Sequence, residues 1–202
     1  MFPKINTLVD LMGRHNIATE RQAELDLLVA FIQQKVDEKA TVLLNFICTH
    51  NSRRSQFSQV WAQVAADYYG IEANCFSGGV EETAFNERAV ESLKRFGFEV
   101  NAEGTHNPVY NIKWSREGEG LNMWSKLFDD AKNPSSHFAA IMTCSHADEN
   151  CPFVAGCEKR IAVRYEDPKH FDDTPLETTF YDYRSFEIAT EMFYVFSKIE
   201  KK

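Results

Sequence analysis

A cysteine followed six residues later by an arginine is the pair in this sequence best suited to chemistry. Cys48 and Arg54 bound the loop Cys48-Thr49-His50-Asn51-Ser52-Arg53-Arg54, and an apolar run precedes it. Where such a loop leaves a strand and enters a helix, its backbone N–H groups point inward, and the helix N-terminus adds partial positive charge. Arg54 can then hold a tetrahedral oxyanion with two parallel hydrogen bonds, and the same field favours the nucleophilic thiolate of Cys48. The spacing therefore predicts an oxyanion-binding loop with its own nucleophile.

Every residue of this loop is a candidate contact to the anion. Ser52 and Ser55 bring hydroxyl donors, and Arg53 brings a second positive charge. The alternative is a buried cysteine at a strand end, but the serines and the amphipathic helix that follows them argue against it. We expect the anion to contact the whole stretch, which comprises Thr49, His50, Asn51, Ser52, Arg53, Arg54 and Ser55.

Two more cysteines lie in a polar segment farther along the chain. Cys144 and Cys151 follow the apolar run 138–142, just as Cys48 follows the run 41–47. The carboxyl ends of parallel strands share one edge of a sheet, and ligands bind there in α/β proteins. Zinc sites use closer cysteine pairs, so the only metal alternative is a weak site at Cys144 and His146. The pattern predicts that both thiols lie at the sheet edge that carries Cys48.

An aspartate-proline pair, Asp167-Pro168, follows the last apolar run. Proline fixes the backbone after Asp167 and biases that aspartate to an extended conformation. The Asp167 carboxyl can then be held over the loop, and in its protonated form it can act as a general acid for a leaving oxygen. A simple turn is the alternative, because most isolated Asp-Pro pairs are turns.

Four short apolar runs read as strands, at residues 41–47, 71–76, 138–142 and 160–163. The first is nearly continuous, as expected of a strand that is buried on both faces of a parallel sheet. Ser77-Gly78-Gly79 reads as a tight turn after the second run. Helical spacing recurs between the strands at residues 55–69 and 87–96, and after the last strand at residues 186–196. Gly70 and Gly97 are expected to end the first two helices, and Asn86 is expected to cap the second. This order predicts a right-handed parallel α/β layout.

Two segments fall outside this pattern. Residues 1–39 read as a helical arm with a break at His15-Asn16, and Thr19 with Gln22 reads as the capping box of its second helix. Residues 105–124 read as an inserted hairpin, which either covers an edge of the sheet or forms an aromatic lid. A helix is expected over residues 123–131. We therefore divide the chain into the arm, 1–39, and one further domain, 40–202.

Composition limits the partners and the compartment. The formal charge is −8 over 202 residues, so a basic face for nucleic acid is not expected. The apolar runs are short, so no membrane span is expected. The start of the chain lacks the pattern of a secretion signal, so the cytoplasm is the expected location. The five cysteines are an odd number, which argues against a structural disulfide framework. Cys75 and Cys157 are expected to be packing cysteines.

Taken together, these segments resemble the low-molecular-weight protein tyrosine phosphatase superfamily and, within it, the thioredoxin-coupled arsenate reductases. The markers are the loop 48–56, the Ser77-Gly78-Gly79 turn and Asp167 before proline. The resemblance implies a three-layer α/β sandwich with a four-stranded parallel sheet, built from the domain 40–202. It also implies that Cys48 is the nucleophile, that Arg54 binds the oxyanion and that Asp167 is the general acid. No bound cofactor is implied.

The segment from Cys144 to Cys151 decides the branch of the family. It is similar to the resolving cysteine pair of the thioredoxin-coupled arsenate reductases, whereas plain phosphatases need no such pair. Lys169 and His170 stand where tyrosine phosphatases of this fold favour tyrosines. The resemblance implies arsenate reduction, in which Cys144 attacks Cys48, Cys151 attacks Cys144, and thioredoxin reduces the last disulfide.

Two other functions stay open for this site. The main alternative is phosphoester hydrolysis through a phosphocysteine, with small phosphoesters or phosphoproteins as substrates. A non-enzymatic protein that only senses phosphate or a similar oxyanion is the third.

Two loop positions depart from the pattern of the family. His50 stands where the reductases usually have glycine, and Arg53 stands where both branches often have a second cysteine. Glycine tolerates positive φ best, so we expect His50 to narrow the loop or to demand a different backbone twist. We expect the charge of Arg53 to favour oxyanion binding.

Overall fold

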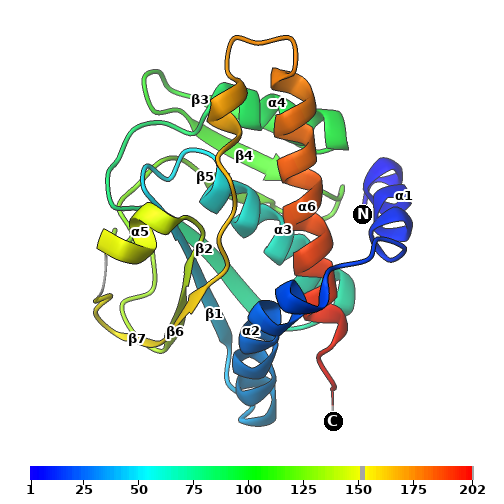
Figure 1. The fold of residues 1–202 in the computed structure, drawn as a ribbon, viewed down its shortest axis with the longest axis vertical. Helices are drawn as coiled ribbons and strands as arrows, with labels where there is room; N and C mark the ends of the chain where they lie inside the picture. The colour runs from blue at the N-terminus through cyan, green and yellow to red at the C-terminus, as the bar shows by residue number, and fades with distance from the viewer. Residues whose placement is uncertain (151–152, 202) are drawn as a thin grey trace.

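The computed structural model describes residues 1–150 and 153–201 and contains a parallel sheet of four strands (Figure 1). The strand order is β2-β1-β6-β7. At the centre lie β1 (Val42–Cys48) and β6 (Phe138–Met142), and at the edges lie β2 (Ala73–Gly79) and β7 (Cys157–Ala162). Each neighbouring pair is parallel. The predicted α/β class and its four-stranded parallel sheet are therefore confirmed.

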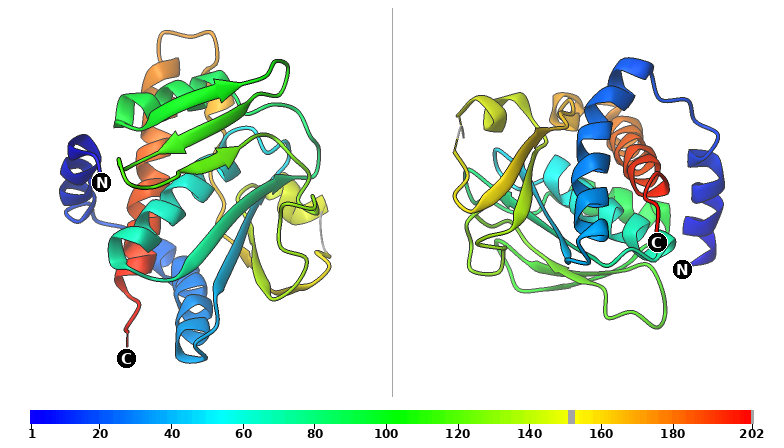
Figure 2. Two further views of the ribbon diagram at one scale, coloured as in Figure 1. Left: turned by 180° about the vertical axis from the view of Figure 1, so that it is seen from behind. Right: turned by 90° about the horizontal axis from the view of Figure 1, so that it is seen from below.

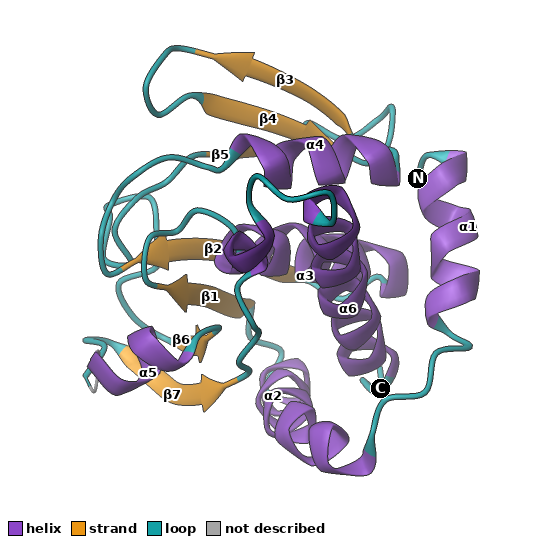
Figure 3. Ribbon diagram, turned by 45° about the horizontal axis from the view of Figure 1, so that its top comes forward, coloured by secondary structure: helices purple, strands orange, loops and turns teal. Residues whose placement is uncertain are grey.

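Side chains of β1 alternate between two apolar layers on opposite faces of the sheet. Leu44 and Phe46 belong to the large core, which includes buried residues of α2 (Thr19–Asp37), α3 (Arg54–Tyr69) and α6 (Glu177–Ser197). Ile47 belongs to a smaller cluster with Ala147 of the short helix α5 (Ser145–Asn150). Figure 3 shows α3 and α6 on one side of the sheet and α5 on the other. The central strand is thus buried on both faces, as its continuous apolar run predicts.

The helix ends that the sequence marks are present in the structure. Gly70 follows α3 with φ +61°, and Gly97 follows α4 (Glu87–Phe96) with φ +102°. Both values lie in the left-handed region, which glycine adopts without steric cost. Asn86 caps α4, because its side-chain oxygen accepts a hydrogen bond from the Arg88 N–H at 3.0 Å. Helix α6 begins at Glu177, earlier than the predicted residue 186.

The predicted turn at Ser77-Gly78-Gly79 is instead the end of strand β2, where Gly79 pairs with Cys48 of β1. Backbone of the connection at Phe128 crosses directly over Gly78. A Cβ atom at Gly78 would lie 2.2 Å from the Phe128 Cα, so only glycine allows this approach. The two glycines therefore extend the strand under a crossing segment and do not reverse the chain.

The predicted hairpin forms, but it belongs to a second sheet. Strands β4 (Val109–Lys113) and β5 (Leu121–Met123) are antiparallel, and β3 (Glu99–Glu103) pairs with β4 to complete the order β3-β4-β5. Tyr110 is buried edge-on against Phe85, and Trp114 Nε1 donates to Asp67 Oδ2 at 3.0 Å. These contacts indicate that the hairpin is a covering element, and they argue against a lid.

The helix predicted over residues 123–131 is wrong, because this stretch bonds to the end of β2. Gly79 N donates to the Lys126 carbonyl at 2.8 Å, and Phe128 N donates to the Gly79 carbonyl at 2.9 Å. Leu127 and Gly79 form an isolated parallel bridge. Backbone N–H and C=O groups of residues 123–131 therefore bond to β2, whereas a helix would need these groups for hydrogen bonds within the stretch itself.

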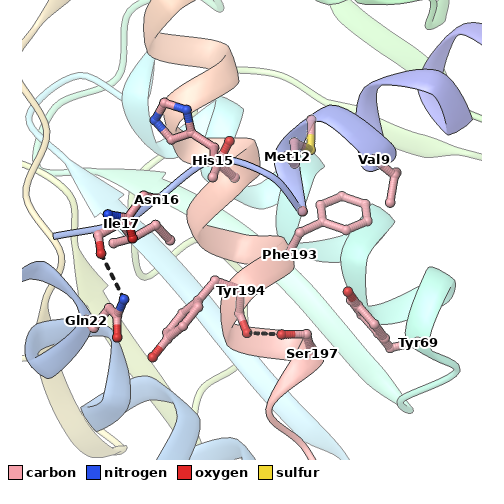
Figure 4. Close-up of a pocket in the computed structure, with 12 residues that line it drawn as sticks. Val9, Met12, His15, Asn16, Ile17, Gln22, Tyr69, Phe193, Tyr194 and Ser197 are labelled. Carbon is pink, nitrogen blue, oxygen red and sulfur yellow. Dashed lines mark hydrogen bonds between the residues drawn. The ribbon is translucent and has the colours of Figure 1, made fainter. Parts of the chain in front are cut away.

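The N-terminal arm forms α1 (Pro3–Met12) and α2, separated as predicted around His15-Asn16. The two helices flank α6 on opposite sides (Figure 2). The capping-box prediction is wrong: Thr19 is already helical, and Gln22 Nε2 donates instead to the Ile17 carbonyl at 2.8 Å, as Figure 4 shows. Apolar arm residues such as Leu25 enter the same core as the sheet. In the part of the chain that the structure describes, no helix has the length and apolar character needed to cross a membrane.

Candidate active site

Cys48 is the last residue of β1, and the loop that follows it enters α3 at Arg54. The Cys48 side chain is buried, and its Sγ lies 3.0 Å from Ser55 Oγ. Ser55 Oγ accepts a hydrogen bond from Asn51 Nδ2 at 2.9 Å, which orients the hydroxyl so that it can donate its hydrogen to the sulfur when Cys48 is a thiolate. A hydroxyl donor at this distance stabilises a thiolate, because it donates to the charged form. The N-terminus of the 16-residue helix α3 adds partial positive charge to the same place.

Asn51 holds the shape of the loop from within. Its backbone is left-handed, with φ +46°, which asparagine tolerates better than most residues. Its side-chain Oδ1 accepts from the Lys126 N–H at 3.0 Å, and its carbonyl accepts from Gln56 Nε2 at 2.8 Å. The side chain is fully buried. Asn51 thus ties the loop to the crossing segment and orients Ser55 at the same time.

The structure corrects the expectation for His50. The left-handed residue of the loop is Asn51, whereas His50 has negative φ, so a side chain at position 50 requires no unusual backbone twist. The imidazole is 38% exposed, and its Nε2 lies 3.3 Å from Glu81 Oε2 at the rim. The His50 carbonyl accepts from Ser125 Oγ at 2.9 Å and from Thr83 Oγ1 at 3.2 Å. The position therefore tolerates histidine where the reductases have glycine.

Two arginines hold the Asp167 carboxylate beside the loop. Arg53 Nε donates to Oδ1 at 2.8 Å, and Arg54 Nη2 donates to Oδ2 at 2.8 Å. Burial acts to raise the pKa of Asp167, but the charges of Arg54 and Arg53 outweigh it and hold the pKa below its ordinary value. Asp167 has the extended backbone predicted for a residue before proline, and Pro168 begins a short 3₁₀ helix, η1 (Pro168–Phe171). The charge of Arg53, expected to serve the anion, is paired with Asp167 in this structure.

The Arg54 guanidinium is only partly paired within the described residues. Its Nη1 donates to the Tyr165 carbonyl at 3.1 Å, whereas its buried Nε has no hydrogen-bond partner among the residues that the structure describes. Buried N–H donors rarely stay unpaired in folded proteins. A shallow pocket beside it is lined by Cys48, His50, Ser52, Arg53, Arg54 and Asp167. The Ser52 hydroxyl donates to the Ala84 carbonyl at 2.7 Å, so its hydrogen is used within the protein and holds the loop in place.

Cys144 lies at the sheet edge that carries Cys48, as the strand pattern predicts. Thr49 Oγ1 lies 3.5 Å from Cys144 Sγ and 3.3 Å from His146 Nδ1. The Ala147 N–H of α5 points to the same sulfur at 3.4 Å. Cys144 is 1% exposed, and no disulfide forms among the described cysteines. Cys151, the other predicted member of the pair, lies outside the described residues.

The remaining cysteines occupy different surroundings. Cys75 is buried, and burial raises the pKa of its thiol far above the ordinary value. Burial also raises the pKa of Cys157, although Arg160 opposes it. Both groups therefore stay protonated at neutral pH, and a protonated thiol is a poor nucleophile. Across residues 1–150 and 153–201 no cluster of three or more histidine, cysteine or acidic side chains is arranged to hold a metal ion.

Several residues that support the site have no signal in the sequence. Ser125 and Lys126 hold the loop through the His50 carbonyl and the Asn51 side chain, and Tyr165 holds Arg54 through its backbone oxygen. Contacts made by backbone atoms do not require a particular residue type, so the sequence does not reveal them. The one sequence signal near Ser125 and Lys126 is the short alternation of apolar and polar residues at 121–124, just before them.

A parallel α/β fold whose central strand ends in a buried cysteine, with an arginine-closed loop after it, defines a class of enzymes that attack oxyanions with a thiolate. The sequence model of low-molecular-weight phosphotyrosine protein phosphatases matches residues 43–111. Arsenate reductase 2 of Staphylococcus haemolyticus is 31% identical over 124 residues, which cover 61% of this chain and 76% of that protein. Arsenate reductase of Staphylococcus aureus matches with the same identity and coverage. The chain belongs to the low-molecular-weight phosphotyrosine protein phosphatase family.

Solved structures share this fold at low sequence identity. A mutant of YwlE from Bacillus subtilis aligns with a TM-score of 0.55 and 15% identity, over 78% of this chain and 98% of that one. A low-molecular-weight protein tyrosine phosphatase from T. tengcongensis aligns with a TM-score of 0.53 and 18% identity, over 79% and 100%. An arsenate reductase in a phosphate-binding state aligns with a TM-score of 0.50 and 16% identity, over 79% and 100%.

Proposed function

We propose that this chain is an arsenate reductase that uses Cys48, Cys144 and Cys151 in turn, with thioredoxin as its reductant in the cytoplasm. One observation carries the proposal: Cys144 Sγ lies against the loop that begins at Cys48, 3.5 Å from the Thr49 hydroxyl. A phosphatase has no use for a buried second thiol at this position. The relatives that are 31% identical to this chain are named arsenate reductases, which supports the same choice.

The first step forms a bond between sulfur and arsenic. Arsenate lies in the loop, held by backbone N–H groups and by Arg54, whose buried Nε is free to donate. The thiolate of Cys48, stabilised by the Ser55 hydroxyl at 3.0 Å, attacks arsenic. One arsenate oxygen leaves as water after it has taken up protons. The product is a thiol–arsenate adduct in which arsenic is still pentavalent.

Asp167 supplies a proton for that leaving oxygen. Before arsenate binds, Arg54 and Arg53 keep the Asp167 pKa low, so the carboxyl is ionised. Arsenate competes with Asp167 for Arg54, and the added negative charge raises the pKa of the neighbouring carboxyl. Substrate binding therefore brings Asp167 toward the protonation state that a general acid needs.

Two thiol exchanges then complete the reduction. The Cys144 thiolate attacks Cys48 Sγ, the electron pair of the S–As bond passes to arsenic, and arsenite leaves in the trivalent state. A disulfide between Cys48 and Cys144 forms. Cys151 next attacks Cys144 Sγ, and Cys48 leaves as a thiolate. Thioredoxin, a dithiol reductant, reduces the disulfide between Cys144 and Cys151 and restores the enzyme.

Single-turnover and multiple-turnover assays of cysteine variants test this order. We expect Cys144→Ser to release no arsenite. We expect Cys151→Ser to release one arsenite per chain and then to stop with Cys48 and Cys144 joined, which mass spectrometry detects. Cys75→Ser is the control and is expected to keep full thioredoxin-dependent turnover, because Cys75 is buried away from the loop. Full turnover by both Cys144→Ser and Cys151→Ser would refute the reductase proposal.

The same variants separate the alternatives. A phosphatase of this fold needs only Cys48, Arg54 and Asp167, so Cys144→Ser would hydrolyse a phosphotyrosine peptide as well as the wild type does. If that hydrolysis is efficient and arsenate yields no arsenite, the phosphatase function is correct. If inorganic phosphate binds tightly and neither substrate is turned over, the chain is an oxyanion sensor.

A further inference from the structure

A half-buried ion pair joins the N-terminal arm to the interior of the molecule. Arg21 of α2 donates from Nε to Glu191 Oε1 at 2.7 Å and from Nη2 to Glu191 Oε2 at 2.8 Å. Glu191 lies on α6 and is 5% exposed. Two parallel bonds between a guanidinium and a carboxylate fix the orientation of both groups. Residues 1–39 contain no catalytic motif, and this pair is one of several contacts through which the arm can act on the rest of the chain, alongside the ion pair between Lys35 Nζ and Glu158 Oε2 at 2.6 Å.

Tyr165 connects the ion pair to the candidate active site. Its hydroxyl donates to Glu191 Oε2 at 2.6 Å, and the Arg21 guanidinium carbon lies 4.9 Å from the centre of its ring. Burial and the nearby Glu191 charge raise the pKa of Tyr165 well above its ordinary value, so the hydroxyl stays a donor. The carbonyl of the same residue accepts from Arg54 Nη1 at 3.1 Å. One buried residue therefore touches the arm ion pair with its side chain and the anion-binding arginine with its backbone.

We propose that Arg21, Glu191 and Tyr165 are positioning residues that hold Arg54 in its oxyanion-binding orientation. Among the described residues, the Arg54 side chain has two acceptors, the Tyr165 carbonyl and the Asp167 carboxylate. Arsenate competes for Arg54 with Asp167, and the Tyr165 carbonyl is then the acceptor that keeps the guanidinium in place. If the Tyr165 hydroxyl loses its hydrogen bond to Glu191, the Tyr165 carbonyl can shift, and Arg54 shifts with it. The inference rests on the proposed function only in giving Arg54 the role of binding the anion.

Binding of inorganic phosphate tests the inference without arsenate turnover. Tyr165→Phe removes the hydroxyl and keeps the ring and the backbone carbonyl. Calorimetric titration should show that the phosphate Kd rises about three- to tenfold, the range expected from one lost hydrogen bond. In an Arg54→Lys background the same substitution should change the Kd less than about twofold. A purely structural role of Tyr165 would weaken binding equally in both backgrounds.

Tyr194→Phe is the matched control. The Tyr194 hydroxyl donates to Asp26 Oδ1 at 3.1 Å and so links the same two helices, α6 and α2, and Tyr165 takes no part in that bond. We expect its phosphate Kd to equal that of the wild type. Arg21→Lys, which keeps the charge and loses the two parallel bonds, should raise the Kd in the same direction as Tyr165→Phe.

Two results would overturn the inference and leave the proposed function intact. Either Tyr165→Phe binds phosphate as the wild type does, or it loses equal affinity in the Arg54→Lys background. Failure of the wild type itself to bind phosphate would instead refute the proposed function, and the inference with it.

Discussion

Replacement of Asn51 tests how the loop keeps its shape. Asn51 is fully buried, has φ +46°, donates to Ser55 Oγ at 2.9 Å and accepts from the Lys126 N–H at 3.0 Å. Asn51→Ala removes both side-chain bonds and places a residue with a Cβ, but without a local polar group, in the left-handed region. Asn51→Gly removes the same bonds and relieves the backbone. The two variants therefore separate backbone strain from hydrogen bonding.

The expected loss follows from these contacts. The Lys126 N–H left buried without a partner costs about 1–3 kcal/mol, and the lost bond to Ser55 costs about 1 kcal/mol. The left-handed backbone adds about 1 kcal/mol for alanine and almost nothing for glycine. We expect Asn51→Ala to lower the free energy of unfolding by about 3–5 kcal/mol and Asn51→Gly by about 1 kcal/mol less.

Urea unfolding followed by tryptophan fluorescence measures both free energies. The rate at which iodoacetamide alkylates Cys48, read by peptide mass spectrometry, reports whether Ser55 still stabilises the thiolate, and we expect a lower rate in both variants. Asn51→Asp is a third case: it keeps the acceptor for Lys126 but adds negative charge to the loop, so it should lose phosphate binding more than stability. A loss below about 1 kcal/mol in Asn51→Ala would refute the role given to this side chain.

Three more predictions concern a glycine of β2, the carboxylate beside the loop and a tryptophan of the core. Gly78→Ala should lower the free energy of unfolding by more than about 2 kcal/mol in urea, because its Cβ would lie 2.2 Å from the Phe128 Cα. Asp167→Asn should lower it by about 1–3 kcal/mol at neutral pH. Because the folded-state pKa of Asp167 is lowered, the stabilisation is present above the unfolded pKa and is lost as the pH falls through the folded one. Unfolding measured at several pH values should therefore show the two proteins converging below about pH 4, and a constant difference would contradict the role of the arginines. Trp61→Phe should cost about 1–2 kcal/mol by thermal unfolding, because the buried indole donates to Ser185 Oγ at 2.9 Å.

Local patterns in the sequence predict much of the fold. The strands β1 and β6 are visible as apolar runs, and α3 and α4 are visible from their spacing and from Gly70, Gly97 and Asn86. Each of these signals acts within one element, because a left-handed glycine or an N-cap satisfies backbone groups of its own helix. Where the hydrogen-bond partner of a backbone group lies in a distant segment, prediction from the sequence fails. A helix is predicted over residues 123–131, but backbone groups of this stretch bond to β2.

By itself, the sequence determined the chemical types at the site: the thiol of Cys48, the guanidinium of Arg54 six residues later, and a second thiol at Cys144 after another strand. Parallel strands that end at one edge bring such residues together, so spacing and strand order suffice. Only the tertiary structure decided that Asp167 is held by both arginines and that the arm reaches Arg54 through Tyr165. Arg21 and Glu191 are 170 residues apart, and neither residue type announces its partner. Such long-range bonds depend on how the whole chain packs, and the electrostatics of the site depend on them.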